Sequence, residues 1–92
     1  MSEYMEIETE LNDDGTVMNF YTNLKLAEGE GEYYDSVEAM EEGSPVAQAL
    51  AVVEGVLTLQ LDGSDLAVTK EDDYDWHIIV ADISAALKDF FI

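Results

Sequence analysis

The segment SPVAQALAVVEGVLTLQLDGSDLAVTKEDDYDWHIIVADISAALKDF, residues 44–90, decides the fold of this chain. It begins with Ser44-Pro45, which is typical of a helix start because serine caps the first turn and proline has no N–H to lose there. An apolar stripe then favours a helix over residues 45–54, made by Val46, Ala49, Leu50 and Val53. Gly55 stands where a glycine that ends a helix belongs. Both ends of this helix are therefore marked in the sequence.

A hairpin follows this helix. Residues 56–61 alternate between apolar and other side chains, which predicts a strand whose inward positions are Leu57, Leu59 and Leu61. Gly63-Ser64 fits a type II′ turn, because glycine takes the first central position of that turn. Residues 66–70 then form the returning strand.

The segment ends with a second long helix, expected over residues 75–91. Its apolar face consists of Trp76, Ile79, Val80, Ile83, Leu87 and Phe90. Acidic residues precede it and Lys88 lies near its end, an arrangement that matches the helix dipole. The acidic run of residues 71–75 thus has a structural explanation before any functional one.

The first half of the chain predicts a further antiparallel pair. Residues 4–11 alternate, with Met5, Ile7, Thr9 and Leu11 on one face and three glutamates on the other, as in a half-buried strand. Residues 12–15 form a turn, and 16–22 are rich in residues that favour strands. Residues 27–32 are expected to form a mobile surface loop.

Two short elements are expected between this pair and residue 44. Tyr33-Tyr34 can form a short edge strand, and Ser36 can cap a helical turn that runs through Met40 and stops at Gly43. The expected fold is an α+β two-layer sandwich of order ββαββα. Its antiparallel sheet has four strands or slightly more, and its two main helices lie on one face. With 92 residues, of which 48% are hydrophobic, the chain is expected to form one domain, residues 1–92.

The charge of the chain limits its partners. Twenty-two acidic residues against three lysines give a net charge of −19. Such a surface repels nucleic acid and anionic membranes, because both are bound through Lys or Arg. The acidity can instead serve as a solvating surface at high salt, steer a basic partner, or mimic nucleic acid. With no basic amino-terminal region and no long apolar run, a cytoplasmic location is expected.

Catalytic, cofactor and metal sites are not expected. The chain has no cysteine, so thiolate ligands and disulfides are excluded. His77 is the only histidine, and a metal site needs three or four converging ligands. Ser44 already caps a helix and has no base beside it in the pattern. Trp76, at helical spacing, is expected in the core or at its rim.

Four short motifs in this order resemble the N-terminal domain of Nfu-type iron–sulfur scaffold proteins. They are Gly43-Ser44-Pro45-Val46-Ala47-Gln48-Ala49-Leu50, Glu54-Gly55-Val56, Asp65-Leu66-Ala67-Val68-Thr69-Lys70 and Asp75-Trp76. The resemblance covers residues 44–90 well. The first half departs from the family pattern, because residues 8–14 lack the proline of a Thr-x-Asn-Pro motif and only Phe20 keeps the aromatic of the strand that follows.

The resemblance implies a role in cluster assembly without cluster binding. The family's Cys-x-x-Cys motif lies in a separate C-terminal domain that this sequence does not include. The expected function is therefore a non-enzymatic accessory domain that docks a protein partner, such as an iron–sulfur assembly factor. A possible partner surface is Glu71, Asp72, Asp73 and Asp75. The alternative is an acidic mimic of nucleic acid that inhibits a basic protein surface, whereas no group of residues supports a small enzyme.

Overall fold

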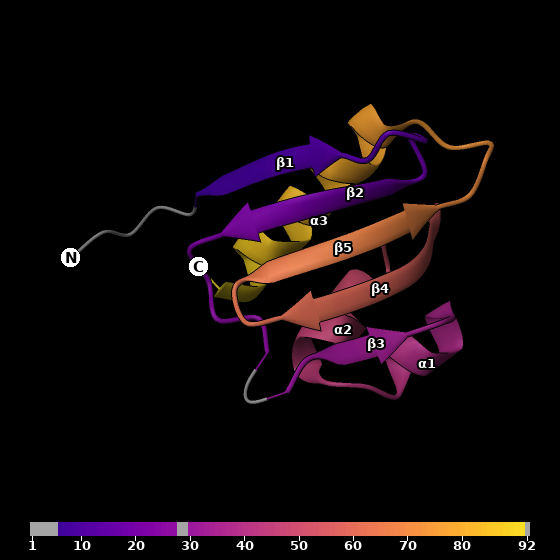
Figure 1. The fold of residues 1–92 in the computed structure, drawn as a ribbon. Helices are drawn as coiled ribbons and strands as arrows, with labels where there is room; N and C mark the ends of the chain where they lie inside the picture. Colours follow the sequence, from indigo (N-terminus) through magenta and orange to yellow (C-terminus); the bar gives the residue numbers. More distant parts are fainter. Residues whose placement is uncertain (1–5, 28–29, 92) are drawn as a thin grey trace.

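A five-stranded antiparallel sheet is the centre of the fold in the computed structural model, which describes residues 6–27 and 30–91. The sheet order is β1-β2-β5-β4-β3 (Figure 1). In chain order the elements are β1 (Ile7–Leu11), β2 (Val17–Thr22), β3 (Glu32–Tyr34), α1 (Val37–Glu41), α2 (Pro45–Leu50), β4 (Val56–Asp62), β5 (Asp65–Lys70) and α3 (Trp76–Phe91). The predicted α+β class is confirmed, with β3 as a fifth strand and α1 as a third helix.

The helices and the sheet form two layers. Figure 1 shows α2 and α3 together behind the sheet, with α1 beside β3, as the prediction of two main helices on one face requires. The buried core lies between these layers and takes its largest fully buried side chains from both. They are Phe20, Met40, Leu50, Leu59, Leu61, Leu66, Val68, Ile79, Ile83 and Leu87. Burial of these apolar side chains is the main source of stability in a domain of this size.

The strand over residues 4–11 is shorter and less buried than expected. β1 begins at Ile7, and the predicted part at Tyr4 and Met5 lies outside the described residues. Ile7 packs against the core, but Thr9 is exposed and Leu11 is 46% exposed. The physical reason is position: β1 is an edge strand, so its helix-facing side is only partly covered.

The two short elements before residue 44 are present. Tyr33 and Tyr34 lie in β3, which pairs with β4 at the other edge of the sheet. The Ser36 side chain accepts a hydrogen bond from the Ala39 N–H (3.1 Å) and so caps α1. In the expected loop of residues 27–32, Ala27 is buried and Glu32 belongs to β3, whereas residues 28–29 lie outside the described residues.

The helix predicted over residues 45–54 ends earlier. The Ser44 side chain caps it as expected, accepting from the Ala47 N–H (3.4 Å), but α2 ends at Leu50. The Val53 N–H then bonds to the Leu50 carbonyl (3.1 Å), a tighter turn than that of an α-helix. This tightening brings Val53 into the core, and the chain reverses at Gly55, whose φ is +91°.

A β-bulge in β4 makes the prediction that Leu57 points inward wrong. The pairing of β4 with β5 shifts between Val56 and Thr58, so one extra residue stands in β4. Val56, Leu59 and Leu61 are buried, whereas Leu57 is 41% exposed. The alternation holds from Leu59 onward and fails only at the bulge. The turn agrees with the type II′ expectation, because Gly63 has a φ of +62° and no described residue other than glycine has a positive φ.

Candidate functional site

The face of the sheet opposite α2 and α3, here called the open face, is the most exposed broad surface built by the strands. Strand pairing places directly opposed residues on the same face of a sheet. One row across the open face joins Glu8 to Tyr21, Tyr21 to Asp65, and Asp65 to Asp62. The next row is Glu10, Asn19, Ala67, Gln60 and Tyr33.

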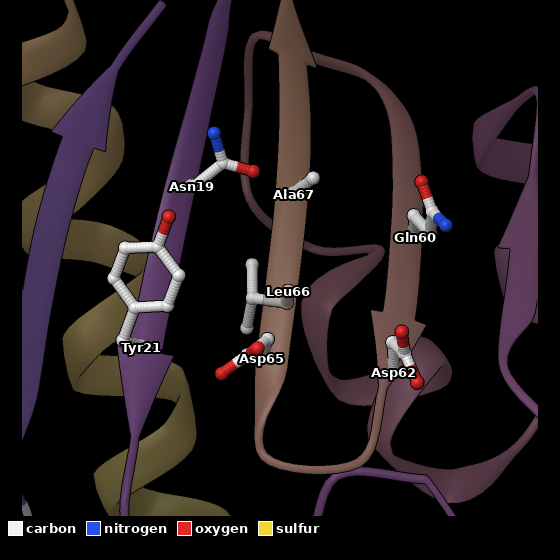
Figure 2. A pocket seen from close by; sticks show the side chains of 7 residues that line it. All are labelled: Asn19, Tyr21, Gln60, Asp62, Asp65, Leu66 and Ala67. Carbon is white, nitrogen blue, oxygen red and sulfur yellow. The ribbon is translucent and has the colours of Figure 1, made fainter.

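A shallow hollow lies in the middle of the open face. Its volume is about 170 Å³, and its lining is Asn19, Tyr21, Gln60, Asp62, Asp65, Leu66 and Ala67. Figure 2 shows Ala67 on β5 between Asn19 on β2 and Gln60 on β4. Since Ala67 carries only a methyl group between two longer neighbours, the surface sinks above it. The hollow is therefore a consequence of one small residue in the central strand.

Tyr21 joins the hollow to the β1 acids. Its hydroxyl donates to Glu10 Oε1 (2.9 Å), although Glu8 is the residue directly opposite Tyr21 in the ladder. This hydrogen bond to Glu10 is the main cause that raises the pKa of the Tyr21 phenol above 10, with smaller effects from partial burial and from Asp65. The phenol therefore stays protonated and remains a donor at neutral pH.

The open face is negative. Glu8, Glu10, Asp62 and Asp65 stand on it, and none of the three lysines, all of which lie in the described ranges, has an open-face position. Lys70 lies in the helix-facing row of β5, where its Nζ is 5.9 Å from the centre of the Trp76 ring. A complementary partner surface would carry Lys or Arg.

The predicted acidic loop lies at the far end of the β4–β5 hairpin from Asp62 and Asp65. Glu71, Asp72, Asp73 and Asp75 are all exposed. The Asp75 carboxylate accepts from the His77 N–H (2.9 Å), so this residue caps α3. The length of β5 thus separates the acidic loop from Asp62 and Asp65, the acids at the rim of the hollow.

The remaining residues singled out by the sequence have structural roles. Trp76 packs at the rim of the core, as expected, and its Nε1–H donates to the Gly15 carbonyl (2.8 Å), which ties the β1–β2 turn to α3. His77 is exposed. Within the described part of the chain, no group of three or more His, Cys, Asp or Glu side chains could hold a metal ion.

The hollow could not be identified from the sequence. Asn19, Tyr21 and Gln60 come together only because β2 pairs with β5, and those strands are far apart along the chain. The alternating pattern does indicate which residues of each strand face away from the core, but it does not show which strands are neighbours.

An α+β sandwich with an exposed, acidic sheet face is thus the class of domain that the structure defines. Residues 7–92 match the family described as "Scaffold protein Nfu/NifU N terminal", and the chain belongs to this family. The resemblance carried by residues 44–90 is thereby confirmed and extends through the first two strands as well.

Relatives and solved structures agree with this assignment. The chain is 30% identical over 88 residues to NifU-like protein 4, mitochondrial, and 31% identical over 88 residues to NifU-like protein 5, mitochondrial, both of Arabidopsis thaliana. These matches cover 95% of this chain but only 30% and 31% of the relatives, so the chain spans about a third of their length.

The fold is shared with two solved structures. A NifU-like protein from Saccharomyces cerevisiae superimposes with a TM-score of 0.76 at 18% identity, covering 97% of this chain and 82% of the other. Protein SAV1430 from Staphylococcus aureus gives a TM-score of 0.72 at 19% identity, covering 89% of this chain and 98% of the other. In residues 6–27 and 30–91, no helix is long and apolar enough to cross a membrane. The names of the Arabidopsis relatives place those proteins in mitochondria, so the cytoplasmic location stays a prediction.

Proposed function

We propose that residues 1–92 form one non-enzymatic docking domain that binds a protein of iron–sulfur cluster assembly through the open face. The observation that carries this proposal is a sheet face without a covering helix in the described structure, acidic and free of lysine. Membership of the Nfu/NifU N-terminal family supports the choice of partner class.

The open face has the chemistry of a recognition surface. Tyr33 is 64% exposed and Tyr21 is 40% exposed, and tyrosine is enriched among the residues that contribute most to protein interfaces. The hollow above Ala67 lies between them and has room for one side chain of a partner. The acids Asp62 and Asp65 at its rim favour a Lys or Arg side chain there.

The acidic loop is a second candidate contact within this proposal. The Asp75 side chain is engaged in capping α3, which leaves Glu71, Asp72 and Asp73 to meet a partner. Because the loop and the rim acids Asp62 and Asp65 lie at opposite ends of the β4–β5 hairpin, substitutions can separate the contributions of the loop and the hollow. A contact at both ends would require a partner that spans the whole hairpin.

Three doubly substituted chains with equal changes in charge test the proposal. Asp62→Lys with Asp65→Lys alters the hollow, Asp72→Lys with Asp73→Lys alters the loop, and Asp82→Lys with Asp89→Lys alters exposed positions of α3 as the control. Each chain is immobilised, and cluster-assembly proteins recovered from the source organism are quantified by mass spectrometry.

We expect the amount of assembly proteins recovered to fall sharply for the hollow variant and to stay unchanged for the α3 control. Recovery that falls for the loop variant alone would move the docking site to residues 71–73. Equal loss in all three variants would mean that only net charge is recognised. Recovery of nucleases or DNA-binding proteins in place of assembly proteins would favour the nucleic-acid mimic instead.

The proposal also implies that the iron–sulfur cluster is bound by another protein or domain and not by these 92 residues. With no thiolate and one imidazole, the 92 residues lack the ligands that hold iron–sulfur clusters. Anaerobic incubation with iron and sulfide should therefore leave the visible absorbance of this chain unchanged. A stoichiometric cluster with charge-transfer bands would contradict the assignment.

A further inference from the structure

Within residues 6–27 and 30–91, no strand pairs with the outer edge of β1, and its backbone groups there can accept another strand. Asn23 N–H bonds to the Glu6 carbonyl (3.3 Å), and Asn12 N–H bonds to the Val17 carbonyl (2.9 Å). In an antiparallel ladder, hydrogen-bonded pairs alternate with pairs that are not. The even-numbered residues of β1 therefore bond to β2, and Ile7, Thr9 and Leu11 direct their N–H and C=O groups away from the sheet.

A groove runs beneath this edge, on the helix side. Its volume is about 430 Å³, and it is lined by Thr9, Met18, Trp76, His77, Val80 and Ala81. Thr9 and Met18 come from the helix-facing rows of β1 and β2, and the other four residues come from the first turns of α3. A side chain that projects from an added strand toward the helices would enter this groove, which is mostly apolar.

The other side of the same edge is acidic. Glu8 and Glu10 belong to the open-face rows of β1, and both are exposed. Side chains of an added strand that point toward the open face would meet these two carboxylates. Since opposite charges on neighbouring strands stabilise their pairing and like charges weaken it, basic residues are favoured at those positions.

A second copy of this chain does not fit the edge. If two β1 strands paired with Thr9 opposite Thr9, Glu8 of each copy would lie opposite Glu10 of the other. This arrangement places like charges directly opposite each other on two chains of net charge −19. The same repulsion is a known means of keeping sheet edges from self-association.

We propose that the β1 edge binds an extended segment of a protein partner in which basic and apolar residues alternate. The segment adds to the sheet as a further strand beside β1. Its apolar side chains enter the groove between β1 and α3, and its basic side chains pair with Glu8 and Glu10. The site is distinct from the hollow above Ala67, and it specifies a strand-adding mode of recognition that goes beyond the proposed docking function.

Synthetic peptides test the site without any natural partner. The probe is the alternating peptide KVKVKVK, and the control KKKKVVV has the same composition and charge. Amide chemical shifts of the isotope-labelled chain are followed by NMR during titration with each peptide. We expect the alternating peptide to shift amides of β1 and of the start of α3 and to bind about tenfold more tightly than the block peptide.

Two N-methylated versions of the alternating peptide test the backbone contacts. One carries methyl groups on the valine amides and the other on the inner lysine amides. In an added strand only one of these sets faces β1, the valine set if the strand is antiparallel and the lysine set if it is parallel. We expect methylation of one set to abolish binding and methylation of the other to be tolerated. Tolerance of both would overturn the proposal, because no ladder would then exist.

Substitutions in the chain complete the test. Ala81→Phe fills the groove from an exposed position, and Glu8→Lys with Glu10→Lys reverses the charge of the edge. Each of these changes should weaken the binding of the alternating peptide about tenfold. The control, Asp82→Lys with Asp89→Lys, should retain most of the binding, because it makes the same change in net charge away from the β1 edge. Equal affinity for both peptides, or shifts confined to residues 71–75, would show a general attraction to acids and would overturn the site. Neither result would bear on docking through the hollow.

Discussion

Tyr21 shows how one side chain can report the arrangement of the open face. Its hydroxyl donates to Glu10, and this bond, together with the negative charges of Glu10 and Asp65, disfavours the tyrosinate form. A raised pKa in the folded state means that the protonated phenol contributes to stability below pH 10. That contribution is lost as the pH rises through the raised pKa.

The pH dependence gives a first prediction. The ring-carbon NMR signal of Tyr21 should titrate above the ordinary tyrosine pKa, and Glu10→Gln should bring its pKa down toward that value. Glu8→Gln removes an equal charge from the residue directly opposite Tyr21 and should have a smaller effect, because Glu8 does not accept the hydroxyl. An unchanged pKa in Glu10→Gln would mean that this hydrogen bond is not formed in solution.

Two glycines with positive φ give a second prediction, because they differ in the space around them. A Cβ at Gly63 (φ +62°) would meet nothing within 4 Å, whereas a Cβ at Gly55 (φ +91°) would lie 2.6 Å from Cγ of Tyr74. Gly63→Ala should cost about 1–2 kcal/mol of unfolding free energy from the left-handed conformation alone. Gly55→Ala should cost about 2–4 kcal/mol, since overpacking adds to the same conformational cost. Denaturant unfolding of the two variants measures the difference, and equal costs would mean that Tyr74 moves aside freely.

At the scale of elements, the bulge in β4 makes neighbouring leucines unequal. Leu59→Ala should cost about 2–5 kcal/mol of unfolding free energy, because Leu59 is fully buried between the sheet and the helices. Leu57→Ala should cost less than about 1 kcal/mol, because the bulge leaves Leu57 partly exposed. Equal losses of stability in chemical denaturation would place Leu57 in the core and contradict the bulge.

The elements differ in how far the sequence determines them. The start of α2, the β4–β5 turn and α3 follow from local chemistry, since Ser44, Gly63 and Asp75 act within a few residues of their own positions. The bulge at Leu57 and the early end of α2 depend on how β4 and Val53 fit a core built by distant segments. A periodic pattern contains no information about that fit, so these two features required the structure.

The same distinction applies to the candidate site. The acidic loop is visible in the sequence because its residues are consecutive. The hollow above Ala67 and the groove beneath β1 each combine residues from strands or helices that are distant along the chain. Only sheet order and register bring them together.

For the whole molecule, charge is the dominant feature. The radius of gyration is 12.2 Å. The sequence has 22 acidic residues and three lysines. The Debye length is about 10 Å at 0.1 M salt, so carboxylates across much of the molecule repel one another, whereas at 1 M it falls to about 3 Å. Because unfolding relieves this repulsion, screening should stabilise the compact state.

The midpoint of thermal unfolding should therefore rise clearly between 0.1 M and 1 M salt, and by similar amounts in NaCl and KCl. Millimolar divalent ions should add only a modest further rise. A midpoint that does not respond to monovalent salt would mean that the acidic side chains are too far apart for their repulsion to destabilise the folded state. A large rise with millimolar calcium would reveal a specific cation site.

The sheet order β1-β2-β5-β4-β3 also determines which step of folding requires contacts between distant parts of the chain. The β1–β2 and β4–β5 hairpins can each form locally, but they join only where β2 meets β5. The pairing of β2 with β5 is here called the seam. Across it the Thr22 hydroxyl donates to the Ser64 carbonyl, and these two residues are 42 positions apart in the sequence. Closing a loop of that length costs about 3 kcal/mol of chain entropy by the logarithmic loop-length term.

That entropy is lost before the side chains of β2 and β5 pack together. The pairing of β2 with β5 should therefore be the rate-limiting step of folding. Truncation of Phe20 or Leu66, which face each other there, should slow folding, whereas truncation of Ile7 at the edge should chiefly speed unfolding. Stopped-flow kinetics of these variants separates the two effects. The contacts of the β1 edge with the core, such as those of Ile7, would then form only after β2 has joined β5.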